Sequence, residues 1–217
     1  MSELTAIVIG ATGATGSALV TQLLEDSRFK SVVVFSRRAL SITHAKLTCH
    51  IVDFNNPQLW ADLVKGDVLF SALATTLKQA GSQKEQYKID YTYQYQTAET
   101  AAANGVKAYV LVSAMGAKEN SMLFYPRIKG QLDKAVCALS FKQIHIFRPG
   151  FLLRQPDKIR PMEKLGIAII QGLNKLGLLK SQKPLPVEVL AQKMRDVLFE
   201  PAVSHFQVYS LDSIFDL

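Results

Sequence analysis

The chain alternates between two kinds of hydrophobic pattern. Short apolar runs rich in β-branched residues are typical of strands buried on both faces of a sheet. The predicted strands, in chain order, are residues 4–9, 31–35, 47–52, 67–70, 106–112, 143–147 and 206–211. Most of the stretches between them repeat apolar residues at helical spacing. Strands that alternate with helices predict an α/β fold with a doubly wound, mostly parallel sheet.

Helices are predicted in most of the segments between these strands, at residues 17–24, 55–64, 87–104, 123–139 and 187–199. Residues 36–46 are too few for the helix of a parallel crossover, and residues 81–86 are predicted to form a loop. Residues 162–179 show an amphipathic pattern with basic ends. We expect this helix in a small lobe of about residues 154–204 that covers a substrate or contacts a second copy of the chain in a homodimer. The alternative is a helix that lies on a membrane surface.

Three glycines, each three positions after the last, follow the first predicted strand. Gly10 would allow a sharp exit from the strand, Gly13 would let a pyrophosphate approach the backbone, and Gly16 would let the next helix pack closely on the strand. A helix that begins here directs its free N–H groups and the positive end of its dipole at one point. We therefore predict a dinucleotide site, with an ordinary glycine-rich turn as the alternative. The predicted contacts are Gly10, Thr12, Gly13, Ala14, Thr15 and Gly16.

The end of the second predicted strand indicates which dinucleotide is bound. An NAD site usually carries a carboxylate about 20 residues beyond the glycines, whereas a basic residue there accommodates the 2′-phosphate of NADP. This chain has Ser36, Arg37 and Arg38 at that point, and no carboxylate stands between Asp26 and Asp53. Guanidinium groups bind phosphate through paired hydrogen bonds. We therefore predict NADP(H) rather than NAD(H); the alternative is that both arginines are solvated loop residues.

Two further strand ends contribute predicted cofactor contacts. Asp53 and Phe54 close the third strand. The Asp53 carboxylate would accept a hydrogen bond from the adenine amino group or cap the next helix, and both alternatives stay open. Small residues after the fourth strand would let a ribose approach closely, and threonine hydroxyls there can bind it. The predicted contacts in this loop are Ala72, Leu73, Ala74 and Thr75.

Ser113 ends the fifth predicted strand, at the edge of a parallel sheet where ligands bind. Twelve positions later comes Tyr125, which shares a face with Lys129 if a helix begins near residue 123. A neighbouring ammonium lowers the pKa of a phenol and makes it a usable general acid, while a serine hydroxyl stabilises charge on the same substrate oxygen. Pro126 fits only in the first helical turn. The alternative is that Tyr125 packs in the interior and Lys129 is solvated.

The sequence resembles the atypical short-chain dehydrogenase/reductases, and in style it is similar to their HTATIP2-like oxidoreductase branch. The resemblance rests on GATGATG at residues 10–16, on Ser113, Tyr125 and Lys129, and on residues 36–38, 52–54, 111–117, 124–133 and 147–153. It implies a Rossmann fold, NADP(H) binding and Ser113, Tyr125 and Lys129 as the catalytic set, with Lys129 also bonded to the nicotinamide ribose. It implies little about the substrate.

The turn after the sixth predicted strand lies across the mouth of the predicted site. It contains Arg148 and Pro149, which we therefore predict to flank the nicotinamide ring. His145 lies within the strand itself, between two isoleucines, and we assign it a structural role. We predict no metal site.

Composition narrows the range of functions. The chain has 217 residues, 48% of them hydrophobic, which suits one domain with a sizeable core. No apolar run reaches the roughly 18 residues that span a bilayer, and the N-terminus begins a strand instead of a signal peptide. The net charge of +7 is spread without a basic run interleaved with aromatics, so we expect no nucleic-acid partner. Cys49 and Cys137 are expected to be buried, reduced thiols, which predicts a cytosolic protein.

Two functions of different classes are compatible with these patterns. The first is an NADP(H)-dependent reductase that transfers hydride to the carbonyl of a small substrate, or oxidises the corresponding alcohol, with Tyr125 as general acid or base. The second is a regulatory protein that binds NADP(H) and a protein partner without turnover. The intact catalytic residue types favour the first function, because a pure sensor does not need that geometry.

Overall fold

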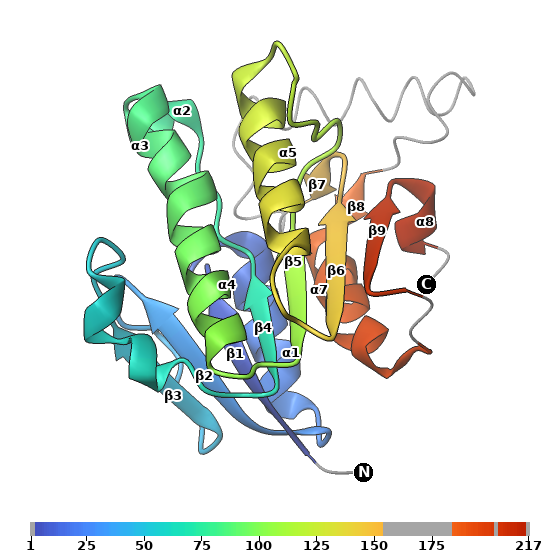
Figure 1. Ribbon diagram of the computed structural model, residues 1–217. Coiled ribbons are helices and arrows are strands. Elements are labelled where there is room, and N and C mark those ends of the chain that lie inside the picture. The colour runs from blue at the N-terminus through green and yellow to red at the C-terminus, as the bar shows by residue number, and fades with distance from the viewer. Residues whose placement is uncertain (1–2, 154–183, 202–203, 216–217) are drawn as a thin grey trace.

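The computed structural model describes residues 3–153, 184–201 and 204–215. Within them, a seven-stranded sheet has the order β3-β2-β1-β4-β5-β6-β9, with every neighbouring pair parallel. The strands are β1 (Leu4–Ile9), β2 (Phe29–Ser36), β3 (Leu47–Ile51), β4 (Val68–Ser71), β5 (Ala108–Val112), β6 (Gln143–Arg148) and β9 (Phe206–Ser210). The strand order reverses between β1 and β4, so the sheet is doubly wound and has its switch point there (Figure 1). The predicted fold class is confirmed.

Helices cover both faces of this sheet (Figure 1). The longer ones are α1 (Ala14–Glu25), α4 (Tyr93–Ala103), α5 (Phe124–Cys137) and α7 (Val187–Asp196), and the short ones are α2 (Leu77–Ala80), α3 (Gln83–Tyr87) and α8 (Asp212–Phe215). A π-helical segment, η3 (Lys88–Thr92), joins α3 to α4, and the 3₁₀ turns are η1 (Pro57–Leu59), η2 (Ala61–Leu63) and η6 (Val197–Phe199). Two short strands, β7 (Leu152–Leu153) and β8 (Leu185–Pro186), pair apart from the main sheet. Helices α1 and α7 lie on one face, and α4 and α5 lie on the other.

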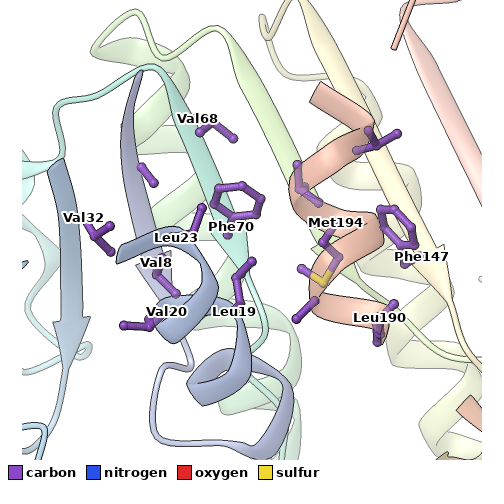
Figure 2. Packing of buried hydrophobic residues seen from close by; sticks show 14 of the residues in the cluster. Val8, Leu19, Val20, Leu23, Val32, Val68, Phe70, Phe147, Leu190 and Met194 are labelled. Atoms are coloured by element: carbon purple, nitrogen blue, oxygen red, sulfur yellow. The ribbon is translucent and has the colours of Figure 1, made fainter. Parts of the chain in front are cut away.

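The side chains of the central strands alternate between two buried layers. Val8 of β1 and Phe70 of β4 pack toward α1 and α7, whereas Ile7 and Leu69 pack toward α4 and α5. Figure 2 shows the first layer, which leucines of α1 and α7 and a methionine of α7 help to fill. Burying each such side chain contributes roughly 1.5–3 kcal/mol. The two layers together fix the positions of the strand ends, where the candidate site lies.

Two predictions of local structure are wrong. Residues 55–64 form η1 and η2 instead of one helix, because Trp60 between the two turns has a non-helical backbone (φ −133°) and its side chain is buried. Residues 81–86 were expected to be a loop but include the start of α3, which the Ser82 hydroxyl caps by accepting the Glu85 N–H. Gly81 ends α2 in the left-handed conformation.

The C-terminal predictions fall partly on residues that the structure does not describe. The helix predicted at residues 187–199 is confirmed as α7 with η6 as its last turn, and it packs against α1. The strand predicted at residues 206–211 is confirmed as β9, at the edge of the sheet. The amphipathic pattern at residues 162–179 and most of the predicted lobe lie outside the described residues. Among the helices that are described, none has the length and apolarity to cross a membrane.

Candidate functional site

A cavity of about 640 Å³ lies at the carboxyl ends of β1, β2 and β4, on both sides of the switch point. It is lined by the loop after each of these strands, by the first turns of α1 and by the start of α7. Ten predicted cofactor contacts line it, namely Gly10, Thr12, Gly13, Ala14, Arg37, Arg38, Ala72, Leu73, Ala74 and Thr75. Ligands of doubly wound sheets bind at this position.

The glycine loop allows a very close approach of two strand ends. Gly10 has φ +83°, a conformation that side-chain-bearing residues rarely adopt, and a Cβ there would lie 2.5 Å from the Ala72 carbonyl oxygen. A Cβ on Gly16 would clash with the Gly10 carbonyl oxygen, so α1 packs directly on the end of β1. Thr15, between Ala14 and Gly16, is buried. Gly16 therefore has the close packing predicted for it, and the left-handed backbone of Gly10 fits the sharp exit from the strand predicted there.

The start of α1 fits a phosphate group. Gly13 is the N-cap of the helix, and no side chain forms a capping hydrogen bond there. Thr12 and Gly13 are exposed and line the cavity. Helix N-termini bind anions through their unpaired N–H groups and the helix dipole. The N-terminus of α1 thus borders the cavity at the position where the sequence predicts a pyrophosphate.

Arg37 and Arg38 follow β2 and line the same cavity with exposed side chains. Neither forms an ion pair with any residue that the structure describes. Ser36 is buried, and its hydroxyl accepts the Arg38 backbone N–H at 3.4 Å. Both guanidinium groups are therefore available for a negatively charged ligand at the end of β2.

Asp53 and Phe54 do not line the cavity. The Asp53 carboxylate accepts hydrogen bonds from the Asn55 N–H at 2.9 Å and from the Asn56 side chain at 2.7 Å, and these bonds hold its pKa below the ordinary value. The N-cap of the following turn is Asn56, so Asp53 does not cap a helix. The Phe54 ring is buried, with the Trp60 ring 5.5 Å away, and belongs to the core.

Ser113 and Lys129 lie together at the carboxyl end of β5. Ser113 is buried, and its hydroxyl has no hydrogen-bond partner among the described residues. Lys129 is fully buried, and its Nζ donates to the carbonyl oxygen of Val112, the neighbour of Ser113, at 3.0 Å. The alternative of a solvated Lys129 is therefore wrong.

Tyr125 lies in the first turn of α5, one turn before Lys129. The N-cap is Leu123, so Pro126 occupies an early position that requires no N–H donor, as predicted. Burial around the phenol and the charge of Asp90 raise the pKa of Tyr125 above its ordinary value. The prediction of a lowered pKa is wrong, because desolvation and the charge of Asp90 both disfavour the tyrosinate. Tyr125 therefore keeps its proton at neutral pH.

Arg148 points to α5 instead of lying free at the site. Its Nε donates to the buried Asp133 carboxylate at 2.9 Å. Asp133 lies one turn after Lys129, so both side chains come from the buried face of α5. The Pro149 carbonyl accepts the Met115 N–H at 3.0 Å, which joins the loops after β5 and β6. Neither Arg148 nor Pro149 lines the cavity.

Sequence reasoning missed a buried carboxylate, Asp90, and part of the cavity wall. Asp90 lies in η3, and its carboxylate accepts the Thr75 N–H at 3.2 Å. Burial raises the pKa of Asp90 to about 6, against the opposing charge of Lys129. The available signal was an aspartate on a helix face that otherwise carries uncharged residues. The cavity residues that were missed are Ser17, Ala18, Thr21, Gln22, Gln79, Ile89, Val187 and Glu188.

A family model described as NAD(P)H-binding matches residues 10–158. The chain belongs to this NAD(P)H-binding family. It is 37% identical over 156 residues to the mitochondrial protein FMP52 of Candida glabrata, a match that covers 70% of this chain and 66% of that protein. It is 33% identical over 177 residues to the mitochondrial protein FMP52-1 of Scheffersomyces stipitis, with 79% and 77% of the two chains covered.

Solved structures share the fold at low sequence identity. MoeE5 in complex with UDP-glucuronic acid and NAD has a TM-score of 0.71 at 18% identity, over 95% of this chain and 76% of that chain. WbmG of Bordetella bronchiseptica in complex with NAD has a TM-score of 0.72 at 13% identity, over 96% and 72% of the chains. The resemblance to the short-chain dehydrogenase/reductases is thus confirmed for the fold and the NAD(P)-binding family. The HTATIP2-like branch stays a prediction.

The prediction of a cytosolic protein is wrong. The relatives from Candida glabrata, Aspergillus oryzae and Saccharomyces cerevisiae are all named as mitochondrial proteins. The prediction rested on two reduced thiols, and Cys49 and Cys137 are indeed free, although half-buried instead of buried. Free thiols indicate a reducing environment but do not distinguish one reducing compartment from another.

Proposed function

We propose that this protein is an NADP(H)-dependent oxidoreductase that reduces the carbonyl group of a small substrate, or oxidises the corresponding alcohol. The observation that carries the proposal is that two groups of residues both lie at the carboxyl ends of the parallel strands. The glycine loop and the exposed arginines lie at the ends of β1 and β2, and Ser113 with Lys129 lies two strands further, at the end of β5. A dinucleotide bound across the carboxyl ends of these strands would reach from one group to the other.

The residues of the cavity would hold the cofactor in an extended position. The N–H groups at the start of α1 would bind the pyrophosphate, and Arg37 and Arg38 would bind the 2′-phosphate. Residues 72–75 would lie beside the ribose of the nicotinamide half. When bound, NADPH supplies the hydride.

Three side chains would handle the proton and the developing charge. The Tyr125 phenol would donate its proton to the substrate oxygen as hydride reaches the carbon. The Ser113 hydroxyl, which lacks a protein partner among the described residues, would donate a hydrogen bond to the same oxygen. The Lys129 ammonium would stabilise the tyrosinate that forms. Tyr125 keeps its proton at neutral pH, so it would act as the general acid in the direction of reduction.

The test combines binding and turnover. Calorimetry with NADPH, NADP⁺, NADH and NAD⁺ should show binding, and NADPH consumption should be measured against a panel of aldehydes and ketones. Tyr125→Phe should lower turnover by about 10²–10⁴-fold with unchanged NADPH affinity. Tyr87→Phe changes an exposed tyrosine and serves as the matched control. Unchanged turnover in Tyr125→Phe would remove the phenol from the mechanism.

The regulatory alternative makes a different prediction in the same experiment. If NADP(H) binds, no carbonyl is reduced, and a protein partner co-purifies in a redox-dependent way, the protein is a cofactor-dependent regulator.

We also infer a mitochondrial location from the names of the relatives. Cell fractionation with a tagged chain tests this location, and a signal confined to the cytosolic fraction would contradict it.

A further inference from the structure

The helical run formed by α3, η3 and α4 has a buried face that changes from apolar to polar along its length. Ala98 and Ala101 of α4 are buried in the core. Gln94, Asp90 and Gln86 precede them at intervals of four residues, and each is at most 3% exposed. We call these three residues the polar row. Figure 1 shows that the run extends past the carboxyl end of β4. Because buried polar groups cost free energy unless they form hydrogen bonds, the partners of the polar row indicate its role.

The π-helical turn of η3 helps to keep the polar row on one face. One turn of α-helix takes 3.6 residues, so positions four apart drift steadily around a regular helix. The turn of η3 is wider, because its hydrogen bonds run from i to i+5, and it offsets this drift between Gln86 and Gln94. Turns of this kind occur frequently at functional sites. The three side chains can therefore reach the same neighbouring segment.

That segment is residues 71–75, which lead out of β4, and the polar row holds both of its ends. At the first end, Ser71 Oγ donates to Gln94 Oε1 at 2.7 Å, and Gln94 Nε2 donates to the Asp90 carbonyl at 2.8 Å. At the second end, the Thr75 N–H donates to Asp90 Oδ2 at 3.2 Å. The Thr75 carbonyl accepts from Gln86 Nε2 at 3.3 Å. Both peptide groups around the Thr75 Cα are thus held by buried side chains.

Between these anchored ends, the main chain has free hydrogen-bonding groups beside the cavity. Residues 72–75 line the cavity wall. The Ala72 N–H donates to the Ile9 carbonyl at 3.0 Å. Within the described chain, neither the N–H groups of Leu73 and Ala74 nor the carbonyl groups of residues 72–74 form a hydrogen bond. Main-chain groups without a protein partner are satisfied by water or by a ligand.

Packing alone would not require polar side chains in this row. Apolar side chains of similar volume would also fill the space, and replacing both partners of a hydrogen bond by apolar groups can be nearly neutral. Apolar contacts, however, do not fix orientation. A hydrogen bond restricts both the distance and the angle between donor and acceptor. The polar row therefore sets the orientation of the Thr75 main chain as well as its position.

We propose that Gln86, Asp90 and Gln94 are positioning residues, which hold residues 71–75 so that their free main-chain groups contact the cofactor. The contact with the nicotinamide half of a dinucleotide rests on the proposed function, whereas the anchoring of the segment does not. A wall that is already ordered loses less conformational freedom on binding than a mobile one. Because the arginines after β2 would bind the adenine half, the polar row should affect affinity for the nicotinamide half alone.

Amide hydrogen exchange tests the anchoring without any ligand. Asp90→Asn keeps an oxygen that can accept the Thr75 N–H, whereas Asp90→Leu does not. Both variants remove the charge, so the difference between them isolates the hydrogen bond. Exchange at Thr75 should be about tenfold faster or more in Asp90→Leu than in wild type, and close to wild type in Asp90→Asn. If Asp90→Leu does not fold, Gln86→Leu replaces it, with exchange about two- to tenfold faster.

Thr97→Val is the matched control for the exchange measurement. Thr97 is also buried in α4, but its hydroxyl donates to the Tyr93 carbonyl of the same helix, at 2.7 Å. Its substitution removes a buried hydrogen bond that does not reach residues 71–75, so exchange at Thr75 should stay at the wild-type rate. Equal exchange rates at Thr75 in the leucine variant and in Thr97→Val would overturn the proposal.

Calorimetry separates the positioning role from a merely structural one. The probes are NADPH and adenosine 2′,5′-bisphosphate, which carries the adenine half alone. Gln86→Leu should lower NADPH affinity by about two- to tenfold and leave affinity for the bisphosphate within twofold of wild type. Thr97→Val should change neither affinity. Equal losses for both probes in Gln86→Leu, or no loss for either, would contradict the positioning role.

The two measurements also distinguish this proposal from the proposed function. If wild type binds no dinucleotide, the proposed function fails, and the role of the polar row toward a cofactor fails with it. The exchange rates at Thr75 still decide whether the polar row anchors residues 71–75. If NADPH binds but no carbonyl is reduced, the comparison of NADPH with the bisphosphate remains decisive, because it does not depend on turnover.

Discussion

The two halves of the candidate site are built in different ways. The half at β1, β2 and β4 consists of main chain, small residues and two exposed arginines around an open cavity. The half at β5 and β6 consists of buried charged side chains from α5 and η3, together with the half-buried Arg148 of β6. The charged groups of the open half are free to form ion pairs with a ligand. In the buried half, charged side chains must be compensated by other side chains of the protein, as in the Arg148–Asp133 ion pair.

This difference determines where each half is sensitive to mutation. Exposed charges cost little to hold and contribute at most about 1 kcal/mol when paired. Removing one partner of a buried pair costs roughly 3–5 kcal/mol, because the other charge stays buried. Mutations in the open half should therefore change ligand affinity. An exception is a position such as Gly10, where two main chains are in contact. Mutations in the buried half should change the free energy of unfolding and its pH dependence.

Gly10→Ala should have the largest effect, because it places a side chain where two main chains meet. The new Cβ would lie 2.5 Å from the Ala72 carbonyl oxygen, in a residue with φ +83°. We expect the free energy of unfolding to fall by about 3–5 kcal/mol, from strain and overpacking together, and dinucleotide binding to be lost. Urea unfolding and calorimetry measure the two effects.

Gly105→Ala is the matched control for Gly10→Ala. Gly105 has φ +82°, but a Cβ there would meet no atom within 4 Å. Its substitution should cost only the conformational strain, about 1–2 kcal/mol. Equal losses in the two variants would show that the contact between the loops after β1 and β4 has no energetic importance.

Gly130→Ala applies the same change to the buried half and should have the second largest effect. Gly130 follows Lys129 in α5, and a Cβ there would clash with the main chain at Lys118 and Glu119. In a helix Ala is otherwise favoured over Gly by roughly 1 kcal/mol. We expect a net loss of about 2 kcal/mol in urea unfolding, because overpacking outweighs this gain. If Gly130→Ala is instead more stable than wild type, the main chain at Lys118 and Glu119 moves away from the new methyl group at little cost.

The open half was largely predictable because its signals are local. Gly10, Gly13 and Gly16 follow a buried strand directly, and the chain must turn there whatever the rest of the fold does. Arg37 and Arg38 were predictable in the same way, because they directly follow β2 and so lie at its carboxyl end. Strand positions were equally clear, because runs of β-branched residues mark buried strands wherever they occur.

The buried half was only partly predictable because its partners are distant in sequence. The spacing of Tyr125 and Lys129 was visible, but the Arg148–Asp133 pair joins β6 to α5 and shows no local pattern. Asp90 lies in a π-helical turn that no periodicity of period 3.6 indicates. The sign of the pKa shift at Tyr125 depended on burial, which is a property of the whole fold.

Replacing both Arg37 and Arg38 by Ala should have an effect of intermediate size, confined to ligand binding. Each charged hydrogen bond to a 2′-phosphate contributes roughly 1.5–3 kcal/mol, so the loss of one from each arginine should lower NADPH affinity by about 100-fold or more. NADH lacks that phosphate, and its affinity should change by less than about threefold. Calorimetry with both dinucleotides gives the ratio.

Lys30→Ala with Lys65→Ala controls for the loss of two positive charges. Both lysines are exposed and do not line the cavity. This variant should weaken NADPH and NADH binding to a similar, small extent, because only the long-range attraction changes. Equal losses of NADPH and NADH affinity in the arginine variant would refute the assignment of the 2′-phosphate site.

Arg28→Ala should have the smallest effect and tests whether burial, and not charge pairing itself, distinguishes the two halves. Arg28 donates to the Asp26 and Asp196 carboxylates at the amino end of the sheet, but its side chain is 38% exposed. Its hydrogen bond lowers the pKa of Asp26, so the pair stabilises the fold above about pH 4 and this contribution is lost as the pH falls further. We expect a loss of about 1 kcal/mol or less at pH 7, which shrinks toward pH 3. Arg28→Lys keeps the charge without the forked geometry, and a loss of about 3 kcal/mol or more in Arg28→Ala would mean that exposure does not separate the two kinds of pair.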